Sequence, residues 1–316
     1  MTELNEDFSR IGQALSQVVV GQSTLIQQLL VALLCGGHTI LEGPPGTGKT
    51  LIAKVLSQLI QSDFRRIQLT PDILPADILG TNIFDLNNRS FNLKKGPVFT
   101  QILLADEINR TPPKTQSALL EAMEEQQVTL DGKRWPLPDL FWVIATQNSL
   151  EFEGTYPLPE AQLDRFLFKL IVDYPNPTAE KQMLLNAQAG FEAKQFDLDQ
   201  IEPIATVEQI LQARQVVKSI NVQEKLLDYL LNIVQTFRQH ADLTLGPSPR
   251  SAVSWLRACK AHAWLANRDY VTPDDVKAVA RPLLRHRLIL SPEAQLDGLK
   301  IDRVISSLLE QVPAPR

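Results

Sequence analysis

Eight consecutive residues combine glycine, lysine and threonine in an order that suits phosphate binding. The stretch GPPGTGKT, residues 43–50, fits the pattern G-x-x-x-x-G-K-S/T. In such a loop the glycines let backbone N–H groups face phosphate oxygens, the lysine reaches the β- and γ-phosphates, and the threonine ligates Mg²⁺. An ordinary turn before a helix is the alternative. We expect a nucleotide site built from Gly43, Pro44, Pro45, Gly46, Thr47, Gly48, Lys49 and Thr50.

A pair of carboxylates follows a second apolar run. Residues 102–105 are apolar, and Asp106 and Glu107 come directly after them. At the end of a buried strand, Asp106 suits the coordination shell of Mg²⁺, and Glu107 suits polarisation of the attacking water. Acidic pairs at strand ends are common, so this pair points to catalysis because the phosphate loop accompanies it.

Two further polar residues stand where an anion could be bound. Asn148 follows the apolar run 141–146, and ligands bind at the carboxyl ends of parallel strands, so its amide could hold the attacking water or the γ-phosphate. A turn asparagine is the alternative. Arg250 opens a predicted helix, where a positive charge is unfavourable unless an anion lies nearby. The alternative there is a solvated arginine.

Arg165 lies in PEAQLDRF, residues 159–166, between an acidic and an aromatic residue. It could pair locally with Asp164 or Glu160, a contact worth only ~0–1 kcal/mol on a surface. It could instead contact a phosphate, and the sequence around it leaves open whose phosphate that is.

The elements that position these residues alternate through residue 172. Strand-like runs at 38–43, 65–70, 101–107, 141–146 and 166–172 alternate with helical patterns at 50–60 and 115–127, which predicts a parallel α/β sheet. Two stretches interrupt the alternation, 84–93 and 128–137, and both are expected to form β-hairpins. The second carries Asp131-Gly132, a strong hairpin-turn signal.

The prolines of DYPNPT, residues 173–178, are expected to end the sheet. Beyond them, apolar residues recur at helical spacing in 222–237 and 251–266, and Thr272 is a suitable N-cap for a further helix. We therefore predict a nucleotide-binding α/β domain over 1–175 and a small helical domain over 178–316.

The composition limits the class of protein. The 316 residues carry a net charge of −5, which gives no general attraction to nucleic acid or to an anionic membrane. No apolar run approaches the ~18–20 residues of a membrane span. The only cysteines, Cys35 and Cys259, cannot form a disulfide framework, and Cys259 and His262 have no second pair to complete a zinc site. These features indicate a cytoplasmic protein.

Taken together, GPPGTGKT, LLADEINR, ATQN, EGTYPLPEAQLDRF and GPSPR resemble the MoxR family of AAA+ ATPases over nearly the whole chain. The resemblance implies a P-loop NTPase fold, with a five-stranded parallel sheet sandwiched by helices and followed by a small all-helical lid. It also implies that the two hairpins, near 83–96 and 128–138, are the insertions of the helix-2-insert clade.

The resemblance implies ATP and Mg²⁺ as cofactors and a role for each motif residue. Val20 and Gly21, in the stretch VVVGQ, would lie against the adenine. Seven further residues match family motifs: Lys49 and Thr50 of Walker A, Asp106 and Glu107 of Walker B, Asn148 as sensor 1, Arg165 as the arginine finger and Arg250 as sensor 2.

Family members form rings, usually hexamers, and act with von Willebrand factor A-domain proteins as chaperone-like remodellers. In a head-to-tail ring, Arg165 would face the ATP of the next subunit. A nucleic-acid motor of the same clade, with phosphate contacts from Lys94, Lys95, Lys133 and Arg134, is disfavoured by the acidic balance. A non-hydrolysing switch would not need Glu107. A chelatase-type motor subunit stays open.

Overall fold

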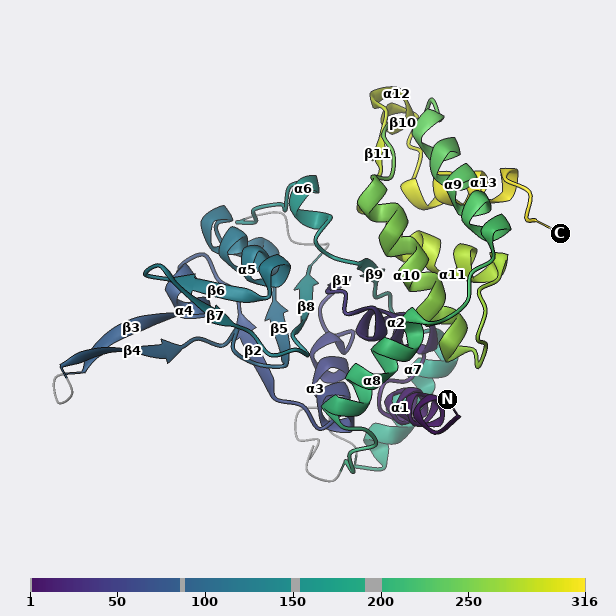
Figure 1. Cartoon of the computed structure of the whole chain (residues 1–316). Coiled ribbons are helices and arrows are strands. Elements are labelled where there is room, and N and C mark those ends of the chain that lie inside the picture. Colours follow the sequence, from purple (N-terminus) through teal and green to yellow (C-terminus); the bar gives the residue numbers. More distant parts are fainter. Residues whose placement is uncertain (1, 86–88, 149–153, 191–200, 316) are drawn as a thin grey trace.

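The computed structural model describes residues 2–85, 89–148, 154–190 and 201–315. At its centre lies a five-stranded parallel sheet with the strand order β2-β5-β8-β1-β9 (Figure 1). Each strand coincides with a strand-like run predicted from the sequence: β1 (Thr39–Glu42), β2 (Phe64–Gln68), β5 (Ile102–Asp106), β8 (Trp142–Gln147) and β9 (Phe168–Ile171). The predicted α/β fold is confirmed.

Helices cover both faces of the sheet, which is why its central strands β5 and β8 are nearly continuous apolar runs. In β5, Ile102 and Leu104 face one core, whereas Leu103 and Ala105 face the other, and none is exposed. The first core is closed by α1 (Thr2–Val18), α2 (Ser23–Cys35) and α3 (Lys49–Leu59), and the second by α4 (Pro75–Leu79) and α5 (Pro113–Glu125).

Both predicted hairpins are present. One pairs β3 (Gly80–Asp85) with β4 (Ser90–Lys95) and projects from the body of the molecule (Figure 1), its tip at 86–88 lying outside the described residues. The other pairs β6 (Gln127–Leu130) with β7 (Lys133–Pro136). Asp131 and Gly132, between these strands, have φ of +50° and +77°, as a two-residue hairpin turn requires.

Helices dominate the chain after β9, as predicted. A short helix, α6 (Glu160–Leu163), precedes β9. In the described residues after β9 the helices are α7 (Pro177–Gln188), α8 (Val207–Lys218), α9 (Glu224–Gln239), α10 (Pro249–Leu265), α11 (Pro273–Leu284), α12 (Pro292–Leu296) and α13 (Ile301–Gln311). A small antiparallel ribbon, β10 (Leu243–Leu245) with β11 (Ile289–Leu290), also lies in this region. Strands this short carry no readable alternation in the sequence.

One continuous core joins the sheet to these later helices. α10 packs along α2, and Trp255, Trp264 and Cys259 of α10 are fully buried in the cluster that also contains the sheet residue Leu41. Trp264 meets the ring of Phe8 edge to face at 5.2 Å. The lid helices are therefore anchored on α2, beside the sheet. No helix in the described ranges is long and apolar enough to cross a membrane.

Candidate functional site

The predicted phosphate loop, residues 43–50, leaves the carboxyl end of β1 and runs directly into α3. Gly46 and Gly48 have φ of +80° and +83°, in the left-handed region that residues with side chains rarely adopt. Gly43 is needed for another reason, because a Cβ atom there would lie 2.1 Å from the backbone oxygen of Val172. The glycines thus let the chain turn sharply into the helix N-terminus, which favours anions.

The Lys49 side chain lies over this loop. Its Nζ donates hydrogen bonds to the carbonyl oxygens of Gly43 and Pro44, at 2.8 and 2.7 Å. Burial lowers the pKa of Lys49, and the carboxylates of Asp106 and Glu107 oppose that shift. The acidic pair therefore acts electrostatically on the loop lysine, which brings two of the predicted motifs together.

Asp106 ends β5 as predicted and is only 8% exposed. The hydroxyl of Thr146, on the neighbouring β8, donates to one carboxylate oxygen of Asp106 and accepts the backbone N–H of Glu107 at 2.9 Å. Arg66, on β2, donates to the other oxygen from Nε at 3.0 Å and from Nη2 at 2.7 Å. Side chains from both adjacent strands therefore fix the orientation of Asp106.

Glu107 begins the turn after β5 with a φ of +59°. Its carboxylate accepts a hydrogen bond from the Gln68 amide at 2.8 Å and pairs with Arg110 at 3.2 Å. Gln68, Arg66 and Thr146 were not predicted from the sequence. Two of these residues could have been found from their positions in the strands. Gln68 ends β2 and Thr146 lies one residue before the end of β8, at the sheet edge where ligands bind.

Asn148 follows β8 at the same edge and is 9% exposed. Residues Glu42 and Gln147 are paired in register across β1 and β8, and the N–H of Gly43 donates to the carbonyl of Gln147 at 3.3 Å. Asn148 is therefore next in the chain to the residue that contacts the start of the phosphate loop.

The donor set of this edge fits a magnesium ion that is shared with a nucleotide. Thr50 and Asp106 offer hydroxyl and carboxylate oxygens, the hard ligands that Mg²⁺ prefers. Within the described ranges, no group of three or more His, Cys, Asp or Glu residues could hold a metal ion alone. This matches the usual protein site for Mg²⁺, in which one or two side chains are completed by nucleotide phosphates and water.

A pocket of about 300 Å³ adjoins the phosphate loop and is lined mainly by apolar groups. Val20, which the resemblance places against the adenine, lines this pocket. Gly21 packs behind it, since a Cβ atom on Gly21 would lie 2.6 Å from that of Ala179 in α7. The far wall was not predicted from the sequence and comprises Tyr174, Pro175, Met183, Asn186 and Ala187. An apolar pocket of this size beside a phosphate loop suits a planar base.

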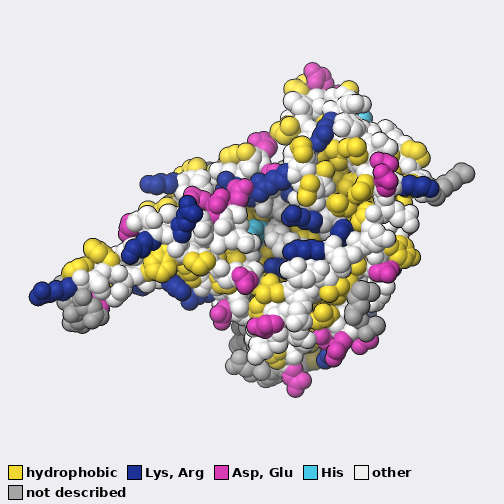
Figure 2. Space-filling model, viewed as in Figure 1, with side chains coloured by type: hydrophobic (Ala, Val, Ile, Leu, Met, Phe, Trp, Pro, Cys, Tyr) yellow, Lys and Arg dark blue, Asp and Glu magenta, His cyan; other side chains and the backbone are white. Residues whose placement is uncertain are grey.

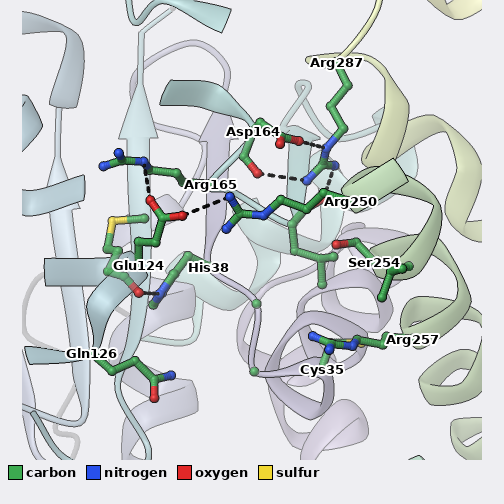
Figure 3. Close-up of a pocket in the computed structure, with 15 residues that line it drawn as sticks. Cys35, His38, Glu124, Gln126, Asp164, Arg165, Arg250, Ser254, Arg257 and Arg287 are labelled. Atoms are coloured by element: carbon green, nitrogen blue, oxygen red, sulfur yellow. Dashed lines mark hydrogen bonds and ion pairs between the residues drawn. The ribbon is translucent and has the colours of Figure 1, made fainter. Parts of the chain in front are cut away.

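Arg165 and Arg250 lie elsewhere, at the opposite edge of the sheet. They line a second pocket, of about 460 Å³, together with His38, which directly precedes β1 (Figure 3). The four residues of β1 rise ~3.3 Å each, so this edge is roughly 13 Å from the phosphate loop. Figure 2 shows basic side chains gathered over the hollow between the sheet domain and the lid helices. The two arginines thus line the same pocket, away from the phosphate loop of their own chain.

One carboxylate links these arginines. Glu124, in the last turn of α5, pairs with Arg165 at 3.1 Å and with Arg250 at 3.0 Å (Figure 3). The predicted anion near Arg250 is therefore present within the chain. The local alternative for Arg165 is wrong in its partners, because Asp164 is paired with Arg287 at 2.6 Å. Glu124 carried no distinguishing signal in the sequence, being one of several acids on an ordinary amphipathic helix.

Buried side chains brace the backbone around this pocket. Arg287, 7% exposed, donates to the Leu167 and Phe166 carbonyls at 2.8 and 2.6 Å as well as to Asp164. His38 accepts the N–H of Val143 at Nδ1, which leaves Nε2 to donate to the carbonyl of Met123 at 3.2 Å. Burial lowers the pKa of His38 to about 4, so its ring is neutral.

Two family models match the sequence. The model described as "ATPase family associated with various cellular activities (AAA)" matches residues 38–168, and the AAA lid domain model matches residues 235–308. The crystal structure of a candidate ATPase from Cytophaga hutchinsonii superposes with a TM-score of 0.89 and 39% identity, covering 99% of this chain and 96% of that one.

Relatives of similar length extend over almost the whole chain. YeaC of Bacillus subtilis, an uncharacterized protein, is 43% identical over 99% of this chain and 96% of its own length. The chaperone MoxR1 of Mycobacterium tuberculosis is 39% identical over 95% of this chain and 80% of its own length. The MoxR protein of Paracoccus denitrificans is 31% identical over 96% of this chain and 94% of its own length.

Proposed function

Because the chain belongs to the MoxR family of AAA+ ATPases, we propose that it hydrolyses ATP with Mg²⁺ in a hexameric ring and remodels a protein partner. Membership of the family supports ATPase activity and a chaperone-like role in general. The finer proposal names a ring, a cytoplasmic location and a von Willebrand factor A-domain protein as partner. The ring is supported by where the charged residues lie on the two edges of the sheet.

The edge that holds the phosphate loop supplies the groups for binding and for water activation. Lys49 would exchange its carbonyl contacts for the β- and γ-phosphates, and Thr50 and Asp106 would hold Mg²⁺, which neutralises phosphate charge when bound. Glu107 would accept the proton of the attacking water, and Asn148 would orient that water. Before it can do so, Glu107 has to share or leave its contacts with Gln68 and Arg110.

The single observation that carries the ring is the separation of Arg165 and Arg250 from the loop of their own chain. Phosphoryl transfer spreads negative charge over the γ-phosphate oxygens, and an arginine there accelerates the reaction by roughly 10³–10⁵. Neither arginine lies at the loop edge in this subunit. In a head-to-tail ring, the edge that carries both arginines would face the phosphate loop of the next subunit.

A protein partner is favoured over a nucleic acid by the surface of the projecting hairpin. Phe84 and Phe91 are 46% and 70% exposed and contact each other with ring centroids 5.1 Å apart. An exposed aromatic pair on a projecting element suits apolar protein segments. The net charge of −5 opposes unspecific binding to nucleic acid. No observation favours a chelatase-type motor over a remodeller.

Mixing two inactive variants tests the proposal. Lys49→Ala should lose ATP binding, whereas Glu107→Gln should bind ATP without hydrolysing it. Arg165→Ala should also be nearly inactive, because it lacks the arginine but keeps Glu107. When Glu107→Gln and Arg165→Ala are mixed in equal amounts with subunit exchange, roughly a quarter of head-to-tail interfaces join an intact Glu107 to an intact Arg165. ATPase activity should then reappear.

The control is a mixture of Lys49→Ala with Glu107→Gln, in which both lesions lie at the same edge and no interface is intact on that side. Recovery in the control mixture, or no recovery in the first mixture once exchange is verified by mass, contradicts an arginine supplied by a neighbour. Near wild-type hydrolysis by Glu107→Gln alone contradicts its role on water.

A further inference from the structure

Two charged residues that line the pocket around Arg165 lie at helix ends where the helix dipole is unfavourable for their charge. Glu124 is in the last turn of α5, where the helix dipole disfavours an acid, and Arg250 is in the first turn of α10, where it disfavours a base. Local rules of this kind are most often broken at functional sites. The two unfavourably placed charges form an ion pair, with 3.0 Å between Arg250 Nη1 and Glu124 Oε1.

Each oxygen of the Glu124 carboxylate binds a different arginine. Oε1 of Glu124 accepts from Arg250, and Oε2 pairs with Arg165, so one guanidinium group occupies each oxygen. The side chains of Glu124 and Arg165 are 33% and 28% exposed, and that of Arg250 is 57% exposed, so all three are accessible to an arriving anion. Exposed ion pairs are worth about 0–1 kcal/mol, which makes this one easy to exchange.

The backbone beneath these side chains is held in place. His38 bonds the carbonyl of Met123, the residue before Glu124, and Arg287 bonds the residues on both sides of Arg165. Exchange of partners would therefore move only the ends of the side chains. The local charge is positive, because two arginines face one carboxylate, and Arg257 lines the same pocket.

We propose that Glu124 is a positioning residue that holds Arg165 and Arg250 at the spacing of two oxygens on one anion. The γ-phosphate of the neighbouring subunit's nucleotide then takes its place. This inference rests on the proposed function, since it needs a neighbour to deliver the phosphate. A carboxylate presents two oxygens to two donors much as a phosphate does, so the arginines reach the phosphate together. Glu124 also competes with that phosphate until it is displaced.

The competition can be measured in the full-length chain without a ring. Lys49→Ala is used as the background, because it silences the phosphate loop, and inorganic tripolyphosphate is the probe in isothermal titration calorimetry. Adding Glu124→Gln should tighten tripolyphosphate binding about ten-fold, since one competing charge is removed. The gain should vanish when Arg165→Ala and Arg250→Ala are added.

Two further variants separate positioning from general charge and from damage to the fold. Glu125→Gln removes the same charge one residue along α5, from an exposed side chain, and should leave the affinity nearly unchanged. Glu124→Asp keeps the charge on a shorter stem that reaches one arginine, and should give an intermediate gain. No gain from Glu124→Gln, an equal gain from Glu125→Gln, or a gain that survives loss of both arginines overturns the proposal.

A second measurement separates this inference from the ring itself. In the Glu107→Gln background with ATP, sedimentation velocity should find self-association of the Glu124→Gln chain at roughly ten-fold lower protein concentration. If no variant associates while the tripolyphosphate gain persists, the ring proposal fails and the competition of Glu124 with phosphate for the two arginines stands. If all variants associate alike and tripolyphosphate binding is unchanged, the role of Glu124 is refuted and the ring stands.

Discussion

Arg287 joins the lid helices to the segment that carries Arg165, and its replacement should lower the free energy of unfolding substantially. Its guanidinium group lies just beyond α11 and donates to the side chain of Asp164 and to the carbonyls of Phe166 and Leu167. Burial lowers the pKa of Arg287, but an arginine stays charged at neutral pH. Arg287→Leu keeps much of the volume and removes every one of these bonds.

The cost follows from the groups that lose their partners. The carbonyl of Phe166 keeps a second donor, the Nε2 of His286 at 3.0 Å, whereas Asp164 loses its ion-pair partner. Breaking a buried ion pair costs about 3–5 kcal/mol, and the 27% exposure of the Asp164 side chain argues for the lower end, about 3 kcal/mol. At about 2–4 °C per kcal/mol for a chain of this size, Tm should fall by roughly 6–12 °C.

Differential scanning calorimetry of the full-length chain measures this change. Arg303→Leu is the matched control, because Arg303 is exposed on α13 and should alter the stability by less than about 0.5 kcal/mol. Arg287→Lys restores the charge but not the planar fork, and should recover less than half of the loss. A Tm within about 2 °C of the wild-type value for Arg287→Leu, or full rescue by lysine, would refute the reasoning.

Two further predictions concern the pH dependence of stability and the apolar pocket beside the phosphate loop. Burial lowers the pKa of His38 to about 4 from 6.5, so only the unfolded chain binds this proton between those values, and the free energy of unfolding should fall by roughly 3 kcal/mol as the pH drops through that window. His38→Gln should flatten this slope in urea titrations from about pH 7 to pH 4, and an unchanged slope contradicts the buried neutral ring. Gly21→Ala, which combines a φ of +81° with crowding against α7, should weaken the binding of a fluorescent ATP analogue about ten-fold. Gly298→Ala, with a φ of +69° and open space around it, is the control, and equal effects from both would rule out crowding as the cause.

The sequence was informative wherever a pattern is local. The phosphate loop, the five strands and the Asp131-Gly132 hairpin turn depend on residues within a few positions of one another, and the structure contains all of them. The helix α2 gave no such signal, although eight of its thirteen residues are buried. Its apolar residues surround the helix because the sheet and α10 enclose it, so it shows little amphipathic periodicity.

The tertiary structure decided the partners of the charged residues. Arg66 meets Asp106 across 40 positions of the chain, Arg287 meets Asp164 across 123, and Arg250 meets Glu124 across 126. Such contacts depend on the strand order of the sheet and on how the lid helices pack against α2, and neither is encoded near the residues concerned. The sequence alone therefore determined which groups could do chemistry. Only the folded chain placed Arg165 and Arg250 at the edge away from the phosphate loop, because a parallel strand separates its two ends by its full length.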